Sequence, residues 1–134
     1  MTIMSEDGQA YTDVGTAEMW NTLYSTVTTK LTGIKINISL ALSFLETGTC
    51  QAEKCIETAK ELNLIRDKLS QLPVSELVYD YKKPTKKVPW MINISPIVTS
   101  CGNFFTTADG KDLIFELNSV LCYASVMNIS VICQ

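Results

Sequence analysis

The clearest hydrophobic pattern along the chain is helical and begins after Gly15. Apolar residues recur at i, i+3, i+4, i+7 and i+11, as on one face of an amphipathic helix: Trp20, Leu23, Tyr24, Val27 and Leu31. Thr16 is a suitable N-cap, and Glu18 meets the positive end of the helix dipole. The pattern predicts a helix that closes at Gly33 and carries a threonine-rich polar face: Thr22, Thr26, Thr28 and Thr29.

Two further helices are predicted before Pro73. Residues 34–40 alternate as a strand would, but Ile38, Leu42 and Leu45 have helical spacing, and we favour a helix over residues 36–46. The next helix ends at Pro73. Its apolar stripe is Ala52, Cys55, Ile56, Ala59, Leu62, Leu69 and Leu72, and a second face carries Glu53, Glu57 and Glu61.

Strand patterns dominate the chain after Pro73. Residues 77–81 have strand composition, and residues 104–106 form a second short candidate. Residues 82–89 form a lysine-rich loop with two prolines, and the apolar run 90–98 is broken by Pro96. Asp109 is predicted to cap a last helix, with Asp112 as the acidic partner three residues on. That helix has the apolar face Leu113, Leu117, Val120, Leu121 and Ala124, and residues 128–133 form a final strand.

These elements predict an α+β fold in one domain over residues 1–134. Helices in the N-terminal half pack on a small, mainly antiparallel sheet. One further helix and a final strand lie near the C-terminus. The short strands are expected to be concentrated in the second half of the chain.

Composition narrows the possible chemistry. The chain of 134 residues is 46% hydrophobic, enough for one core, and it contains no histidine. The lack of histidine excludes Ser-His-Asp and Cys-His nucleophile pairs and any His-ligated zinc or iron site. Carboxylate, lysine or tyrosine chemistry and oxygen-ligated Mg²⁺ or Ca²⁺ remain, but none has a recognisable spacing. Asp109-Gly110-Lys111-Asp112 lacks the later glutamate of an EF-hand. We therefore predict a binding protein without catalytic residues, metal or cofactor.

Cysteines and termini indicate the compartment. The odd, irregularly spaced set Cys50, Cys55, Cys101, Cys122 and Cys133 fits reduced and mostly buried thiols. The polar N-terminus, with Glu6 and Asp7, does not resemble a secretory signal. No apolar run approaches the roughly 20 residues that span a bilayer. These features predict a cytoplasmic protein that does not contact a membrane.

Charge points to a basic partner. The net charge is −3 and the pI is about 4.9. Residues 1–67 hold nine acidic and five basic residues, against five and six in residues 68–134. Glu53, Glu57 and Glu61, with Asp80 as a fourth candidate, are the residues we expect to contact a basic protein, although a plain solvated helix face is the simpler explanation of the stripe. The lysines of residues 82–87 fit a solvated loop better than a nucleic-acid site.

Several stretches together resemble a known family. They are residues 14–16, residues 61–80, Pro89-Trp90, residues 93–99 and residues 103–113. Their order and spacing are similar to the bacterial immunity-protein-70 family of polymorphic toxin systems over residues 14–132. The chain departs from the family in lacking a glycine after Trp90 and in the many lysines of the preceding loop.

The resemblance implies a cytosolic inhibitor of a toxin's C-terminal domain, as in contact-dependent growth inhibition. The toxin would be basic and nuclease-like, and its active or target-binding surface would be covered. The matched residues are expected to be structural: Gly15, Thr16, Pro89, Trp90, Asn103, Asp109, Gly110 and Asp112. Two alternatives stay open, namely a carboxylate- and metal-dependent enzyme and a regulatory or adaptor domain for an endogenous protein. The oligomeric state is also open.

Overall fold

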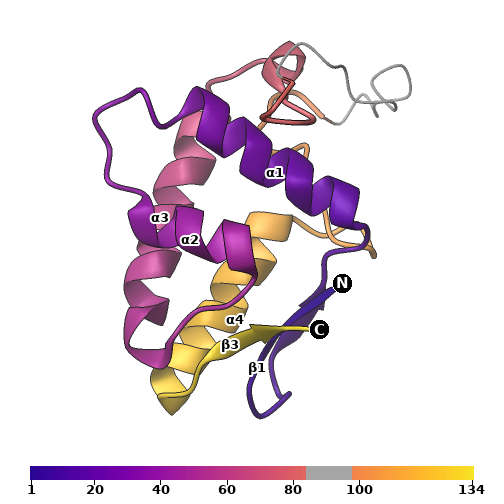
Figure 1. The fold of residues 1–134 in the computed structure, drawn as a ribbon. Helices are drawn as coiled ribbons and strands as arrows, with labels where there is room; N and C mark the ends of the chain where they lie inside the picture. Colours follow the sequence, from indigo (N-terminus) through magenta and orange to yellow (C-terminus); the bar gives the residue numbers. More distant parts are fainter. Residues whose placement is uncertain (84–97) are drawn as a thin grey trace.

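The computed structural model describes residues 1–83 and 98–134. Two strands come first, followed by the helices and a last strand (Figure 1). The elements are β1 (Thr2–Ser5), β2 (Tyr11–Asp13), α1 (Ala17–Lys30), α2 (Ser39–Thr47), the 3-10 turn η1 (Ala52–Lys54), α3 (Cys55–Leu69), the 3-10 turn η2 (Val74–Glu76), α4 (Leu113–Met127) and β3 (Val131–Cys133). The predicted α+β class, with helices packed on a small antiparallel sheet, is confirmed.

The sheet joins the two ends of the chain. Its strand order is β2-β1-β3, and both pairs are antiparallel, with Ile3 opposite Thr12 on one side and Cys133 on the other. Thr2 and Gln134 exchange two backbone hydrogen bonds of 2.8 Å. The final strand is confirmed over Val131–Cys133. Among the described residues the prediction that strands concentrate in the second half is wrong, because two of the three strands there lie before α1.

The segment predicted as a strand at residues 77–81 lies instead against α1, without strand geometry. Thr26 Oγ1 accepts from the Val78 amide (3.0 Å) and donates to the Val78 carbonyl (3.3 Å). Ser25 Oγ accepts from the Tyr81 amide (3.1 Å). Helix side chains thus satisfy the backbone groups that a neighbouring strand would otherwise pair.

The second predicted strand in this half is also wrong, because Thr106 makes only an isolated bridge to Asp112. Residues 84–97 lie outside the described part of the chain. They include most of the lysine-rich loop and nearly all of the apolar run that begins at Trp90.

Helix α1 is confirmed, and Thr16 Oγ1 accepts from the Met19 amide as its N-cap. The helix ends at Lys30 rather than at Gly33. Its threonine face is only partly solvated, because Thr22 and Thr26 are fully buried whereas Thr29 is exposed. Thr26 faces the segment described above, and Thr22 Oγ1 donates to the Glu18 carbonyl (2.8 Å). The predicted amphipathic helix is therefore covered on more than one side.

The next two helices also form, with shifted faces. Helix α2 spans Ser39–Thr47 where residues 36–46 were predicted, and it ends at Gly48 in the left-handed conformation (φ 75°). In α3 the predicted apolar stripe is partly wrong. Ile65 is fully buried and was left out, whereas Ile56 is 42% exposed. The buried set follows Cys55 at intervals of three and four residues, which places Ile56 outside it.

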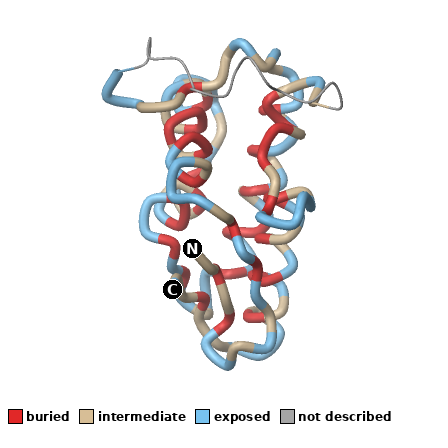
Figure 2. The backbone as a smooth tube through the Cα atoms, turned by 90° about the vertical axis from the view of Figure 1, so that its right-hand side faces the viewer, coloured by how far each residue is buried: buried red, intermediate tan, exposed pale blue. Residues whose placement is uncertain are grey.

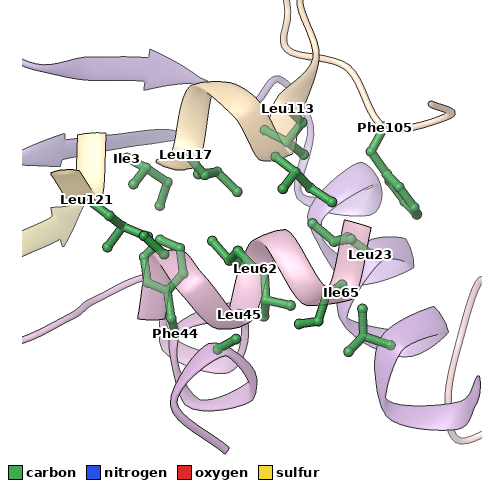
Figure 3. Packing of buried hydrophobic residues seen from close by; sticks show 14 of the residues in the cluster. Ile3, Leu23, Phe44, Leu45, Leu62, Ile65, Phe105, Leu113, Leu117 and Leu121 are labelled. Atoms are coloured by element: carbon green, nitrogen blue, oxygen red, sulfur yellow. The ribbon is translucent and has the colours of Figure 1, made fainter. Parts of the chain in front are cut away.

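One hydrophobic cluster connects β1, β3 and the four helices α1 to α4 (Figure 3), and the buried stretches of these elements face one another (Figure 2). Figure 3 shows Ile3 of the sheet beside Leu117 and Leu121 of α4, with Phe44, Leu45, Leu62 and Ile65 of the other helices facing them. The Trp20 indole N–H donates to the Leu45 carbonyl (2.7 Å), so even this large side chain has its polar atom satisfied.

Candidate functional site

The first two glutamates of the predicted acidic stripe are exposed. Glu53 lies in η1, and Glu57 lies in the first turn of α3. The Lys60 ammonium sits 3.2 Å from Glu57 Oε1, an exposed ion pair between residues three apart that contributes little to stability. Glu53 and Glu57 are therefore free of the folding core and can meet another protein.

Glu61 has a role inside the fold. Its Oε1 accepts a hydrogen bond from the Ala41 amide (3.0 Å) in the first turn of α2. The N-cap of α2 is Ile38, which has no side-chain oxygen to serve these amides. Asn37 Oδ1 accepts from the Ser39 amide (3.3 Å), so α2 is capped by two side chains from outside it. Sequence spacing had placed Glu61 with the exposed glutamates.

Asp80 lies outside α3, in the segment that follows η2. Its neighbours are held to α1, where Asn21 Nδ2 donates to the Tyr79 carbonyl (3.0 Å) and Ser25 binds the Tyr81 amide. Asp80 Oδ1 accepts from the Lys82 amide (2.9 Å), which closes a local turn. Asp80 and the three glutamates therefore belong to different elements of the fold.

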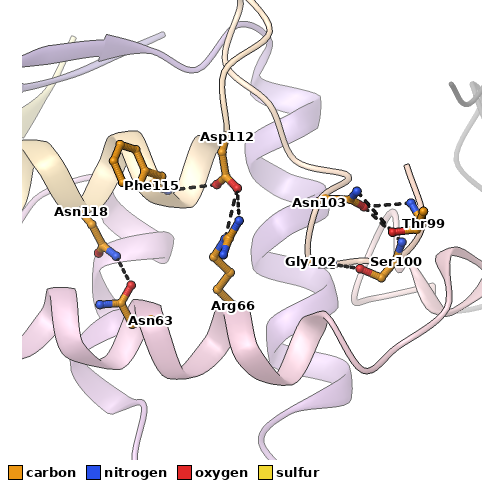
Figure 4. A network of polar contacts seen from close by, with 9 residues as sticks. All are labelled: Asn63, Arg66, Thr99, Ser100, Gly102, Asn103, Asp112, Phe115 and Asn118. Atoms are coloured by element: carbon orange, nitrogen blue, oxygen red, sulfur yellow. Dashed lines mark hydrogen bonds and ion pairs between the residues drawn. The ribbon is translucent and has the colours of Figure 1, made fainter. Parts of the chain in front are cut away.

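Asp112 connects α3 to α4 (Figure 4). It is the N-cap of α4 and accepts from the Phe115 amide (3.1 Å), while the Arg66 guanidinium of α3 donates to its other oxygen. One turn further, Asn118 Nδ2 donates to Asn63 Oδ1. The prediction that Asp109 caps this helix is wrong by three residues.

Asp109 instead stabilises the turn before the helix. The Thr107 hydroxyl donates to Asp109, and this hydrogen bond holds the pKa of the carboxyl below its usual range. Gly110 follows in the left-handed region (φ 84°), and the Lys111 ammonium lies 3.5 Å from Asp109. The two aspartates of this motif thus have separate tasks, one in the turn and one at the helix.

Two other residues that were expected to be structural, Gly15 and Asn103, also shape the backbone. Gly15 has φ 79°, and its amide donates to Asp13 Oδ1 (2.8 Å) just before α1. Asn103 Oδ1 accepts from the amides of Thr99 (3.0 Å) and Ser100 (3.1 Å), which folds the loop that returns to α3. Pro89 and Trp90 lie outside the described residues.

An acidic hollow at the edge strand β2 was not predicted from the sequence. It has a volume of about 490 Å³, and its lining includes three carboxylate residues and one lysine. The lining residues are Tyr11, Thr12, Asp13, Ala108, Asp109, Lys111 and Glu116. No sequence signal joins these positions, because the strand and the turn are about 95 residues apart. The hollow adds a second acidic surface to that of Glu53 and Glu57.

The buried thiols are unreactive because they remain protonated. Burial raises the pKa of Cys55 from 9.0 to about 12 and that of Cys101 from 9.0 to about 11, so both stay protonated near neutral pH. All five cysteines are free, and most are buried as predicted, with Cys133 half-buried and Cys122 exposed. Within residues 1–83 and 98–134, no group of three or more acidic or cysteine side chains is arranged to hold a metal ion.

Comparison with known proteins relates the chain to one family. A family model described as Immunity protein 70 matches residues 6–132 of the 134-residue chain. No curated protein and no solved structure matches the chain. In the described part of the chain, no helix has the length and apolar character needed to cross a membrane.

Proposed function

The chain belongs to the immunity protein 70 family, and we propose that it neutralises a cognate bacterial toxin by binding the toxin's C-terminal domain in the cytoplasm. The toxin is a basic, nuclease-like domain delivered by contact-dependent growth inhibition or a similar system. The immunity protein acts without catalysis, by covering the active or target-binding surface. The family match over residues 6–132 is the observation that carries this proposal.

The acidic surface supports a basic partner. Glu53 and Glu57 are exposed and do not pack in the hydrophobic core. The net charge of −3 also favours the approach of a positively charged domain. Charge complementarity of this kind accelerates association. Fast association matters because the toxin must be bound before it acts on its target. Glu61, whose carboxylate is bound to α2, and Asp80, which lies beside α1, would contribute from the margins of the interface.

The proposed function is tested by co-expression with the toxin domain encoded beside the gene. We expect growth to be rescued and a stable complex to co-purify, whereas the toxin domain alone stops growth. A folded immunity protein that neither rescues growth nor binds its neighbour would contradict the proposal. An endogenous partner, as for an adaptor domain, would then be the better explanation.

The contact surface is tested by reversing charges at two sites. Glu53→Lys with Glu57→Lys should weaken toxin binding at least tenfold, about 1.4 kcal/mol, in isothermal titration calorimetry. Glu46→Lys with Asp67→Lys is the matched control, because both residues are exposed and the net charge changes equally. Equal losses in both variants would show long-range attraction alone. An unchanged affinity in the first variant would remove these glutamates from the interface.

A further inference from the structure

Helix α4 carries large apolar side chains on the side that faces solvent as well as on the side that faces the core. Its buried residues are Leu113, Ile114, Leu117, Val120, Leu121 and Ala124. Its outward side carries Phe115, 64% exposed, and Val126, 84% exposed, with the exposed Ser119 and Cys122 between them. Glu116 is the single charged residue among its fifteen. A helix that is hydrophobic all round is normally covered on all sides.

These four outward residues, the α4 stripe, form one continuous line along the helix. Their spacings of four, three and four residues keep them on one face of an α-helix. The flanks of α4 are occupied in the described structure. Asn118 is bound to Asn63 of α3, and the Tyr123 hydroxyl donates to Asp7 of the β1–β2 turn (2.7 Å). The stripe lies between these two flanks and opposite the core, so it is open to another molecule.

We propose that the α4 stripe is a dimerisation surface, on which the same helix of a second copy packs in the antiparallel direction. The side chains along the stripe are large at both ends (Phe115 and Val126) and small in the middle (Ser119 and Cys122). Their spacing is the same from either end. An antiparallel copy therefore sets Phe115 of one chain beside Val126 of the other, and Ser119 beside Cys122. The small central residues allow the two helices to approach closely. Self-complementarity of this kind is what a two-fold interface requires.

Charge favours a second copy over the toxin at this surface. The stripe carries no charged side chain, so two copies meet without repulsion, while it offers nothing to attract a basic domain. Charge is concentrated elsewhere, on Glu53 and Glu57 and around the hollow at β2. One helix from each copy buries less surface than a standard protein–protein interface, so the dimer is expected to be weak and concentration-dependent. The proposal does not depend on what the protein inhibits.

Sedimentation equilibrium of the full-length protein over a wide concentration range tests the proposal. We expect a monomer–dimer equilibrium that Val126→Glu weakens about a hundredfold, because each interface then buries two unpaired carboxylates. Glutamate is a better helix former than valine, so α4 should still form in this variant. Thr29→Glu, at an exposed position of α1, is the matched control and should dimerise like the wild type.

Cys122 provides a second readout because it lies near the expected two-fold axis. A short bismaleimide should link two wild-type chains, Cys122→Ser should abolish the product, and Val126→Glu should reduce its yield strongly. Wild-type protein that remains monomeric at the highest concentration would overturn the proposal. A dimer that survives Val126→Glu and still cross-links would overturn it equally.

Discussion

Glu61 shows at the scale of single residues how a surface charge can belong to the fold. Its carboxylate accepts from the Ala41 amide at the start of α2, where negative charge also meets the helix dipole. We expect Glu61→Ala to lower the free energy of unfolding by about 1 kcal/mol. Glu57→Ala removes only the exposed pair with Lys60 and should change stability by less than about 0.5 kcal/mol.

Urea unfolding followed by circular dichroism measures both variants. Equal stability of the two would show that Glu61 does not cap α2. Toxin affinity gives a separate readout, because a capping role predicts that Glu61→Ala binds nearly normally at temperatures where it is folded.

Gly102 marks a close approach between the returning chain and the end of α3. A Cβ atom built on Gly102 would lie 2.8 Å from the Ser70 Cα, whereas one on Gly33 meets nothing within 4 Å. Gly102→Ala should therefore cost about 1–3 kcal/mol, since backbone must move to admit the methyl group. Gly33→Ala should leave stability unchanged or raise it by up to about 1 kcal/mol, through a less flexible unfolded chain. Thermal unfolding of the pair checks this, and a loss of similar size in both would contradict it.

At the scale of elements, the segment around Val78 depends on one threonine of α1. Thr26→Val keeps the shape of the side chain but leaves the Val78 amide and carbonyl, both buried, without their partner. We expect a loss of about 1–3 kcal/mol in the free energy of unfolding.

Thr28 is the matched control on the same helix. Its Oγ1 is buried and has no hydrogen-bond partner within the described residues. Thr28→Val should leave stability unchanged or raise it slightly, because no bond is lost and an unpaired polar atom is removed from the interior. If Thr26→Val were as harmless as Thr28→Val, the segment would be held by packing alone.

The helices could be predicted from the sequence because each carries its own apolar period and end signals. Thr16 before Trp20 and Leu23 is such a combination, and α1 begins where it indicates. The first hairpin was missed although Asp7-Gly8 is a typical hairpin turn, because β1 is only four residues long. Residues 77–81 have strand composition but no neighbouring strand, and composition does not reveal which partner satisfies a backbone.

The candidate site was less predictable because it depends on contacts between distant residues. Periodicity placed Glu53, Glu57 and Glu61 on one face, but only the packing of α2 against α3 shows that Glu61 is used inside the fold. Asp109 and Asp112 are both suitable caps, and the Arg66 contact that accompanies the true cap spans 46 residues. The hollow at β2 likewise exists only once the strand meets the turn.

At the scale of the whole molecule, the proposed toxin contacts and the α4 stripe use different residues. If both proposals hold, wild-type protein forms a complex of two immunity proteins and two toxin domains, and Val126→Glu forms a one-to-one complex. Light scattering after size-exclusion chromatography distinguishes these masses. Growth protection should persist in Val126→Glu, because Glu53 and Glu57 are untouched. Loss of protection by a folded Val126→Glu protein would instead make the stripe a toxin contact.

The stability of the molecule should fall as the pH rises above about 9, the usual pKa of a thiol. In the folded protein Cys55 and Cys101 keep their protons up to pKa values of about 12 and about 11, whereas unfolded thiols ionise near 9.0. The unfolded state therefore binds fewer protons than the folded state in this window, and its stability relative to the folded state grows with pH. The hydrogen bond from Tyr123 to Asp7 raises the pKa of the tyrosine and acts in the same direction.

Urea midpoints between pH 7 and pH 10 measure this decline. In a variant with Cys55→Ala and Cys101→Ala the fall should be shallower, even though the cavities lower stability at every pH. Cys122→Ala, whose thiol is exposed, is the matched control and should keep the wild-type slope. A slope that is the same in all three proteins would mean that the buried thiols do not set the alkaline limit. Tyr123, whose pKa is raised by its hydrogen bond to Asp7, would then be the next group to test.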